Sequence, residues 1–133
     1  MLDFGCSSGR AVRVLHAAFP EIEWHACDPI EASIQWATAH LPGVRFAVSP
    51  TKPPLAYPDE FFDRVFAISI WSHFSARAAL QWLQEMRRVI RPSGHLVLTT
   101  HGLESIAYYA RRNLRPAPGL LEGNQDVFVF ERR

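Results

Sequence analysis

The stretch Leu2–Arg10, with the sequence Leu-Asp-Phe-Gly-Cys-Ser-Ser-Gly-Arg, constrains the fold of this chain more than any other. A short apolar strand leads into a turn of small residues, and apolar residues with helical spacing follow directly. Glycine lets a ligand approach the backbone closely, and the free N–H groups at a helix start attract an anionic group. The stretch therefore predicts a strand, a ligand-binding turn and a helix, in that order.

Strand and helix patterns alternate along the rest of the chain. The apolar spacing predicts strands over 22–27, 44–48, 61–70, 95–100 and 126–131, and helices over 11–19, 29–41, 75–91 and 103–113. Such alternation is typical of an open, mostly parallel sheet with helices on both faces. We therefore predict an α/β, doubly wound fold that forms a single domain over residues 1–133.

Local patterns refine this prediction. Residues 61–70 form the most continuous apolar run, as expected for a parallel strand buried on both faces, so Ile68 is predicted to be fully buried. Ser75 is a predicted helix cap, and residues 92–94 predict a turn before the next strand. Four prolines within residues 49–60 predict a stiff loop rather than a regular element.

The composition argues against several classes of protein. A formal net charge of +1 provides no electrostatic footprint for nucleic acid or for an anionic membrane surface. The arginines within 87–91 and 111–115 are interpreted as partners of helix C-terminal dipoles, with a phosphate-binding patch as the alternative. No apolar run approaches the roughly 20 residues that span a membrane. Two cysteines, Cys6 and Cys27, form no disulfide framework, so we expect a reduced pair in a cytoplasmic protein.

Asp28 is a candidate binding residue outside the turn. It lies nineteen positions after Gly9, at the end of the second predicted strand. Ligands of doubly wound sheets lie beyond the carboxyl ends of the strands, where a carboxylate can accept hydrogen bonds from both hydroxyl groups of a ribose. The alternative is that Asp28 only caps the next helix, with Pro29 at its first position. The position after a glycine turn favours the ribose role.

Four segments of the chain resemble those of one enzyme family, the class I S-adenosylmethionine-dependent methyltransferases. Within residues 2–101, they are 3–9, Asp28, 62–65 and 83–94. The first motif of that family is D/E-x-G-x-G-x-G, in which Gly5 and Gly9 match and Ser7 replaces the middle glycine. Residues 125–130 look like the final antiparallel strand of the family. The resemblance implies a Rossmann-like sheet with that strand at its end.

The resemblance also implies a site for S-adenosylmethionine across the first, second and fourth strands. In such a site the amides of residues 6–9 face the methionyl carboxylate, Asp28 holds the ribose, and Pro29 and Ile30 line the adenine. Relatives often carry an acidic residue after the third strand, where this chain departs with Ser49. The predicted cofactor residues are Asp3, Gly5, Cys6, Ser7, Gly9, Asp28, Pro29, Ile30, Ser49 and Ser69.

Methyl transfer itself needs little from side chains. The sulfonium makes the methyl carbon electrophilic, so the protein mainly aligns the reactants and excludes water. Candidate general bases are His73 and His101, which follow the fourth and fifth predicted strands. For His73 we favour the alternative, a structural role at a helix start. The histidines and cysteines show no metal-ligand spacing, and no metal is expected.

We therefore predict a cytoplasmic methyltransferase that acts on a small molecule, with no nucleic-acid or membrane partner. One alternative is a non-catalytic binding module of the same fold. Another is a nicotinamide-dependent oxidoreductase, which Ser7 and Arg10 disfavour because the dinucleotide motif needs glycines at these positions. Because Met1 directly precedes the first strand, we expect a domain truncated at its N-terminus and shortened after the fifth strand. A homodimer through the edge strand 127–130 is one way to complete it.

Overall fold

The computed structural model of the chain describes residues 1–100 and 127–131. Its strands are β1 (Leu2–Phe4), β2 (Trp24–Asp28), β3 (Val44–Val48), β4 (Phe62–Ala67), β5 (Ile90–Thr99) and β6 (Val127–Glu131). The described helices are α1 (Val12–Ala18), α2 (Glu31–His40) and α3 (Ala76–Val89), with a 3-10 turn, η1 (Trp71–His73). The predicted helix over 103–113 and the candidate base His101 lie outside the described residues.

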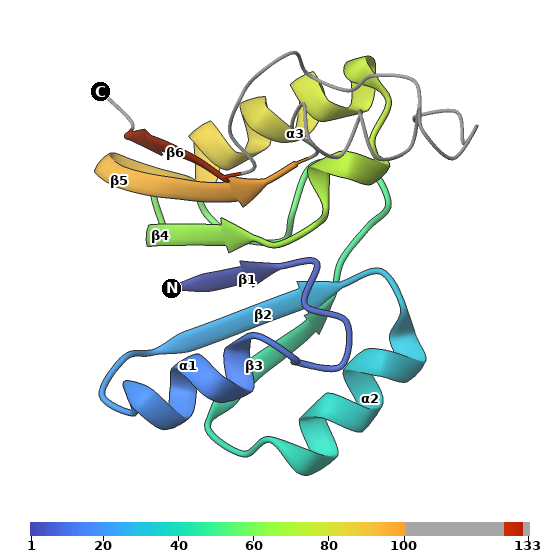
Figure 1. Cartoon of the computed structure of the whole chain (residues 1–133), viewed down its shortest axis with the longest axis vertical. Helices are drawn as coiled ribbons and strands as arrows, with labels where there is room; N and C mark the ends of the chain where they lie inside the picture. Colours follow the sequence, from blue (N-terminus) through green and yellow to red (C-terminus); the bar gives the residue numbers. More distant parts are fainter. Residues whose placement is uncertain (101–126, 132–133) are drawn as a thin grey trace, which may run out of the picture.

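The strands form one sheet in the order β3-β2-β1-β4-β5-β6 (Figure 1). β1 to β5 run parallel, and β6 pairs antiparallel with β5. From β1 the chain moves outward to β2 and β3 and then returns to β4, on the other side of β1. The predicted α/β fold with a parallel, Rossmann-like sheet is confirmed. The strand order reverses beside β1, which is where such sheets bind ligands.

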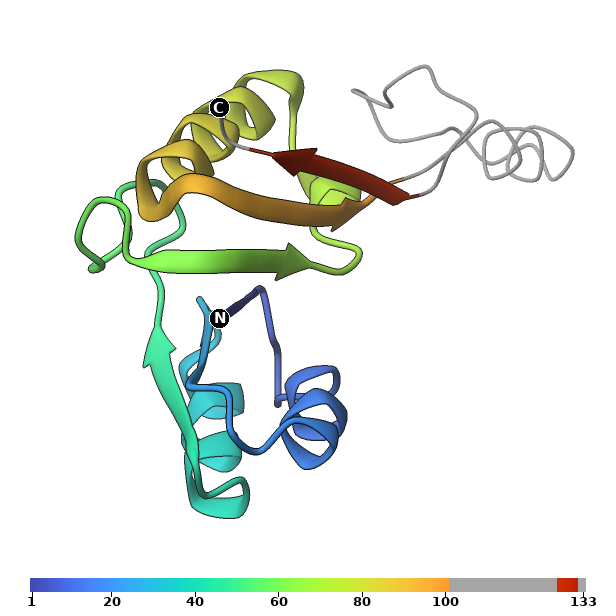
Figure 2. The same ribbon diagram turned by 90° about the vertical axis from the view of Figure 1, so that its left-hand side faces the viewer.

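Helices cover both faces of the sheet. One core cluster joins Leu2 and Phe4 to Met86 of α3, and a second joins Trp24 to side chains of α1 and α2. Accordingly, α3 lies along β5, whereas α1 and α2 lie along β2 and β3 (Figure 2). Successive residues of a strand point to opposite faces. Asp3, between Leu2 and Phe4, therefore faces the side of the sheet that α1 covers.

Ile68 is not buried, contrary to the prediction from the apolar run. β4 ends at Ala67, and Ile68 is 48% exposed. The chain turns at Ser69, whose backbone is left-handed with φ 62°. Ile68 thus lies beyond the last strand pairing, at the wall of a cleft. The large loss of stability expected on truncating a buried isoleucine does not apply to it.

The junction between α3 and β5 differs from the prediction at one end. Ser75 caps α3 as predicted, because its Oγ accepts the Ala78 N–H at 3.3 Å. At the other end, β5 begins directly where α3 stops, so residues 92–94 lie inside the strand. The pairing of β4 with β5 shifts register between Phe62 and Arg64. The predicted turn is therefore wrong, and an irregularity within the strand takes its place.

An ion pair between the buried Glu85 and the half-buried Arg88 holds the proline-rich loop that follows β3 against α3. Oε1 of Glu85 accepts the Leu55 N–H at 2.7 Å and pairs with Nη2 of Arg88 at 2.5 Å. Arg88 also donates to the carbonyls of Leu55 and Tyr57, at 3.2 and 2.8 Å, and to Oδ1 of Asp59 at 2.7 Å. These bonds satisfy backbone groups that a loop packed on the protein would otherwise leave unpaired. The position of the loop therefore depends on one arginine of α3.

Candidate functional site

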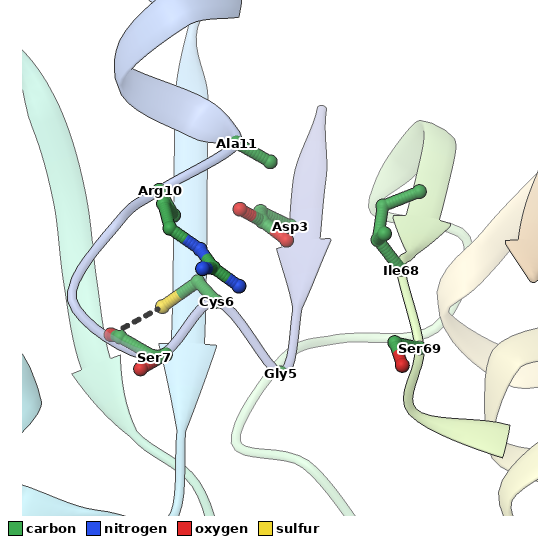
Figure 3. A pocket seen from close by; sticks show the side chains of 8 residues that line it. All are labelled: Asp3, Gly5, Cys6, Ser7, Arg10, Ala11, Ile68 and Ser69. Atoms are coloured by element: carbon green, nitrogen blue, oxygen red, sulfur yellow. Dashed lines mark hydrogen bonds between the residues drawn. The ribbon is translucent and has the colours of Figure 1, made fainter. Parts of the chain in front are cut away.

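Two clefts meet at Gly5, beyond the carboxyl ends of the central strands. The small cleft, with a volume of about 260 Å³, lies between the turn after β1 and the end of β4 (Figure 3). The large cleft, of about 460 Å³, is lined by the ends of β2 and β3, by the 3-10 turn and by α3. Both lie where the strand order reverses. This is the position at which a doubly wound sheet binds its ligand.

Nine of the ten predicted cofactor residues line one cleft or the other. The small cleft contains Asp3, Gly5, Cys6, Ser7 and Ser69. The large cleft contains Gly5, Asp28, Pro29, Ile30 and Ser49, together with the candidate base His73. Gly9 lines neither cleft, because Leu41 and Phe46 pack against it. The turn and two strand ends thus come together as the sequence predicts, while the role of each residue stays a prediction.

Gly5 is required by both its conformation and its surroundings. Its φ is +80°, in the left-handed region that glycine adopts without strain. A Cβ at this position would lie 2.3 Å from Cδ1 of Ile70, which also lines the large cleft. Any side chain here would therefore displace Ile70 at the point where the two clefts meet.

Ser7 has the backbone of a glycine but keeps a side chain. Its φ is 50°, and its N–H donates to Oδ2 of Asp28 at 2.8 Å. The left-handed region costs a residue with a Cβ about 1–2 kcal/mol. The neighbouring residue, Ser8, does not have a positive φ. Ser8 is therefore a control for Ser7, because both have the same side chain and only Ser7 has a left-handed backbone.

We expect Ser7→Gly to leave the free energy of unfolding unchanged or to raise it by up to about 1 kcal/mol. Relief of the left-handed strain is offset in part by the greater entropy of glycine in the unfolded chain, about 0.5–1 kcal/mol. Ser8→Gly has the entropy cost without any relief of strain, so it should lower the free energy of unfolding by about 0.5–1 kcal/mol. Urea denaturation measures both. A larger loss for Ser7→Gly than for Ser8→Gly would contradict the strained assignment.

Asp28 links the turn to the helix that follows β2. Its Oδ2 accepts the Ser7 N–H at 2.8 Å, and its Oδ1 accepts the Ile30 N–H at 2.9 Å. The N-cap of α2 is Ile30, so Asp28 is not the cap and Pro29 is not the first helical residue. The alternative of a helix cap at Asp28 is therefore wrong, because α2 begins only at Glu31. Asp28 is 6% exposed, these two bonds fix the orientation of its carboxylate, and each oxygen keeps a second acceptor position for a ligand hydroxyl.

The amides of the turn are mostly engaged within the protein. The Cys6 N–H donates to the Cys27 carbonyl at 3.0 Å, the Ser7 N–H to Asp28, and the Gly9 N–H to the Cys6 carbonyl at 2.9 Å. An anion beside the turn would therefore find few free amides. The described residues that line the small cleft include one cationic side chain, Arg10. It extends over the cleft in Figure 3. The sequence alone does not identify Arg10 as a binding residue.

Asp3 lies at the base of the small cleft with an unpaired oxygen. The residue is 2% exposed, and its Oδ2 has no hydrogen-bond partner in the part of the chain that the structure describes. Burial, opposed by the hydrogen bond from the Val12 N–H and aided by the nearby Asp28 carboxylate, raises the pKa of Asp3 to about 7. A buried carboxyl with a free acceptor indicates a ligand-binding position rather than a structural contact.

The two cysteines are neighbours in the fold, but their thiols lie in different environments. Cys6 belongs to the core cluster on the α1 face, and Cys27 to the cluster on the α3 face. Both are free and buried. Burial raises the pKa of the Cys6 thiol well above its usual range and that of Cys27 to about 12. Both sulfurs are therefore protonated near neutral pH and poor nucleophiles.

The large cleft has an aromatic wall that the sequence did not identify. Phe4, Phe74 and Trp82 line it, with ring centroids 4.7 Å apart for Phe4 and Trp82 and 6.1 Å for Phe74 and Trp82. His73 lies beside this wall at the end of η1. The signal in the sequence was the cluster of aromatic residues after β4, which is equally typical of a core.

A metal site and a membrane-spanning helix find no support in residues 1–100. No group of three or more His, Cys, Asp or Glu side chains could hold a metal ion there. Within the same described part of the chain, no helix is both long and apolar enough to cross a membrane. The paired clefts are the candidate site because they contain nine of the ten predicted cofactor residues.

A family of methyltransferase domains matches residues 1–94. The chain belongs to this family. Two curated relatives are named malonyl-[acyl-carrier protein] O-methyltransferase. The relative from Methylococcus capsulatus is 30% identical over 142 residues, covering 100% of this chain and 46% of its own length. The relative from Halorhodospira halophila is 31% identical over 115 residues, covering 80% of this chain and 36% of its own length.

The fold also matches solved structures. A crystal structure of a protein from Pyrococcus horikoshii OT3 is 26% identical with a TM-score of 0.71, and the match covers 84% of this chain and 53% of that one. The chain spans less than half the length of the curated relatives that it matches. The comparisons thus establish the family of the domain, and the activity of a whole protein is a separate question.

Proposed function

We propose that the chain binds S-adenosylmethionine across both clefts and that the protein transfers its methyl group to a small molecule, free or linked to a carrier. The observation that carries this proposal is the junction of the two clefts at Gly5, with one buried carboxylate in each. Membership of a methyltransferase family supports it. The names of the two curated relatives favour a carboxyl oxygen as the methyl acceptor.

The residues of the clefts fit the chemical groups of this cofactor. Asp28 would hold the ribose hydroxyls, with Pro29 and Ile30 beside the adenine. In the small cleft, Arg10 and Asp3 supply one positive and one negative group for the carboxylate and ammonium of the methionyl end. The unpaired Oδ2 of Asp3 is the polar atom that this fit would satisfy.

Methyl transfer requires alignment of the cofactor and the acceptor more than it requires acid–base catalysis. When bound, the cofactor supplies an electrophilic methyl group on a positively charged sulfur. The aromatic wall and Ile70 would exclude water, and His73 is in the large cleft as a candidate base or positioning residue. Four further points remain predictions from the sequence. They are the role of His101 as a second candidate base, a cytoplasmic location, the absence of a nucleic-acid partner and a homodimer.

The test is binding of S-adenosylhomocysteine by calorimetry, compared between the wild type and Asp28→Asn. We expect the variant to bind about 10- to 150-fold more weakly, the range for a lost hydrogen bond to a charged group. Because Asp28 also accepts the N–H groups of Ser7 and Ile30, urea denaturation must show that the variant is folded.

The matched control is Glu31→Gln, which removes the same charge from an exposed position in the first turn of α2. Its affinity should equal that of the wild type. Equal affinity of a folded Asp28→Asn protein would remove the ribose role. No binding to the wild type would remove the proposed function as a whole.

A further inference from the structure

Asp3 is the one side chain of the small cleft that combines deep burial with an unused acceptor. It is held in the middle of β1 by pairing to both β2 and β4, so it cannot move out to solvent. Its Oδ2 has no partner within the described residues, and the residue is 2% exposed. A buried carboxylate with one oxygen unpaired is costly, whereas its protonated form has no charge to desolvate.

Apart from the Val12 N–H, the described groups around Asp3 do not compensate a negative charge. Asp28 at the end of β2 adds a like charge, and the Cys6 and Cys27 thiols are neutral. From α1, the Val12 N–H is the opposing dipole. From the β4 side, Ile68 and Ser69 carry no titratable group. Arg10 lines the cleft, yet no ion pair joins it to Asp3 among the residues that the structure describes.

We propose that Asp3 is partly protonated in the free protein at neutral pH and that an ammonium group entering the small cleft displaces this proton into the solvent. The inference rests on the proposed function, since the ammonium is that of the methionyl end of the cofactor. No bond to carbon is made or broken. The carboxyl O–H ionises, the buffer takes the proton, and the carboxylate pairs with the cation.

The size of the effect follows from linkage. Burial raises the pKa of Asp3 to about 7, so at pH 7 the group carries about half a proton in the free protein. A cation at contact distance lowers the pKa of a carboxyl by about 1–3 units. Binding at pH 7 should therefore release close to half a proton per ligand. Affinity should fall by up to about tenfold for each pH unit below the pKa of the free protein.

The experiment is titration calorimetry of S-adenosylhomocysteine at pH 7 in two buffers, phosphate and Tris. Phosphate takes up a proton with little heat, whereas Tris takes it up with much. We expect binding to be more exothermic in Tris, by about half of the difference between the two ionisation heats. Asp3→Asn, which keeps the size but cannot ionise, should give the same heat in both buffers. Glu31→Gln should keep the difference.

A second ligand distinguishes the contribution of the small cleft to binding from that of the large cleft. 5′-Methylthioadenosine has the nucleoside and the sulfur but lacks the amino-acid end, so it should bind without any dependence on the buffer. Binding of S-adenosylhomocysteine with equal heats in both buffers, or a difference that persists in Asp3→Asn, overturns the inference and leaves the proposed function intact. Failure of S-adenosylhomocysteine to bind at all overturns the proposed function instead.

Discussion

Arg88→Ala is expected to lower the free energy of unfolding by up to about 3–5 kcal/mol, the range for removing one partner of a fully buried ion pair, because Glu85 is buried and Arg88 is half-buried. The substitution leaves the Glu85 carboxylate, whose side chain is 6% exposed, without its cation. It also leaves the carbonyls of Leu55 and Tyr57 without a donor. These three losses act on one loop, so they should appear as one cooperative change.

The adjacent residue provides the control for this prediction. Arg87 lies on the same helix, one residue away, and is exposed. Arg87→Ala should change the free energy of unfolding by less than about 0.5 kcal/mol, as is usual for surface positions. Urea denaturation of both variants makes the comparison. Equal effects at positions 87 and 88 would contradict a specific role for the buried pair.

A double variant distinguishes the unpaired charge from the lost packing. Adding Glu85→Gln to Arg88→Ala removes the buried charge but retains an oxygen that can accept the Leu55 N–H. The double variant should therefore be more stable than Arg88→Ala alone. The loop that these residues hold begins with residues that line the large cleft, so affinity for S-adenosylhomocysteine should fall with Arg88→Ala and recover in part in the double variant.

The parallel sheet was predictable because its signals are local. Alternating apolar patterns identified strands and helices, and the glycines of the first turn identified where the ligand site would lie. Asp28 could be assigned to the same edge because it follows a strand. The contacts of Asp28 could not be predicted. Whether its carboxylate caps a helix or accepts the Ser7 N–H depends on the residue at which α2 begins.

The predictions that failed depended on contacts between distant segments. Ile68 belongs to an apolar run that continues beyond the end of β4. The local pattern does not show where the pairing with β5 ends. The bonds between Arg88 and the loop after β3 join residues about thirty positions apart, and arginines near a helix end have a simpler local explanation. The missing partner of Asp3 likewise becomes visible only when the surrounding elements are in place.

Asp3→Asn is expected to stabilise the protein above pH 7 and to remove a pH dependence of the wild type. The pKa of Asp3 is about 7 in the folded protein, against about 3.9 in an unfolded chain. Between these values the folded state binds more protons than the unfolded state. The free energy of unfolding therefore falls as pH rises from about 4 to about 7 and is level above that. Three pH units at about 1.4 kcal/mol each set an upper limit of roughly 4 kcal/mol.

The measurement is urea denaturation of the wild type and Asp3→Asn from pH 5 to pH 8. The difference between the two proteins is the relevant quantity, because His25 acts in the opposite direction. Burial lowers the pKa of His25, so its contribution to stability is lost as pH falls below about 6.5 in both proteins. The advantage of the asparagine variant should grow toward pH 8 and shrink toward pH 5. Parallel curves would show that Asp3 is already ionised, and the same result would remove the proton that ligand binding is expected to release.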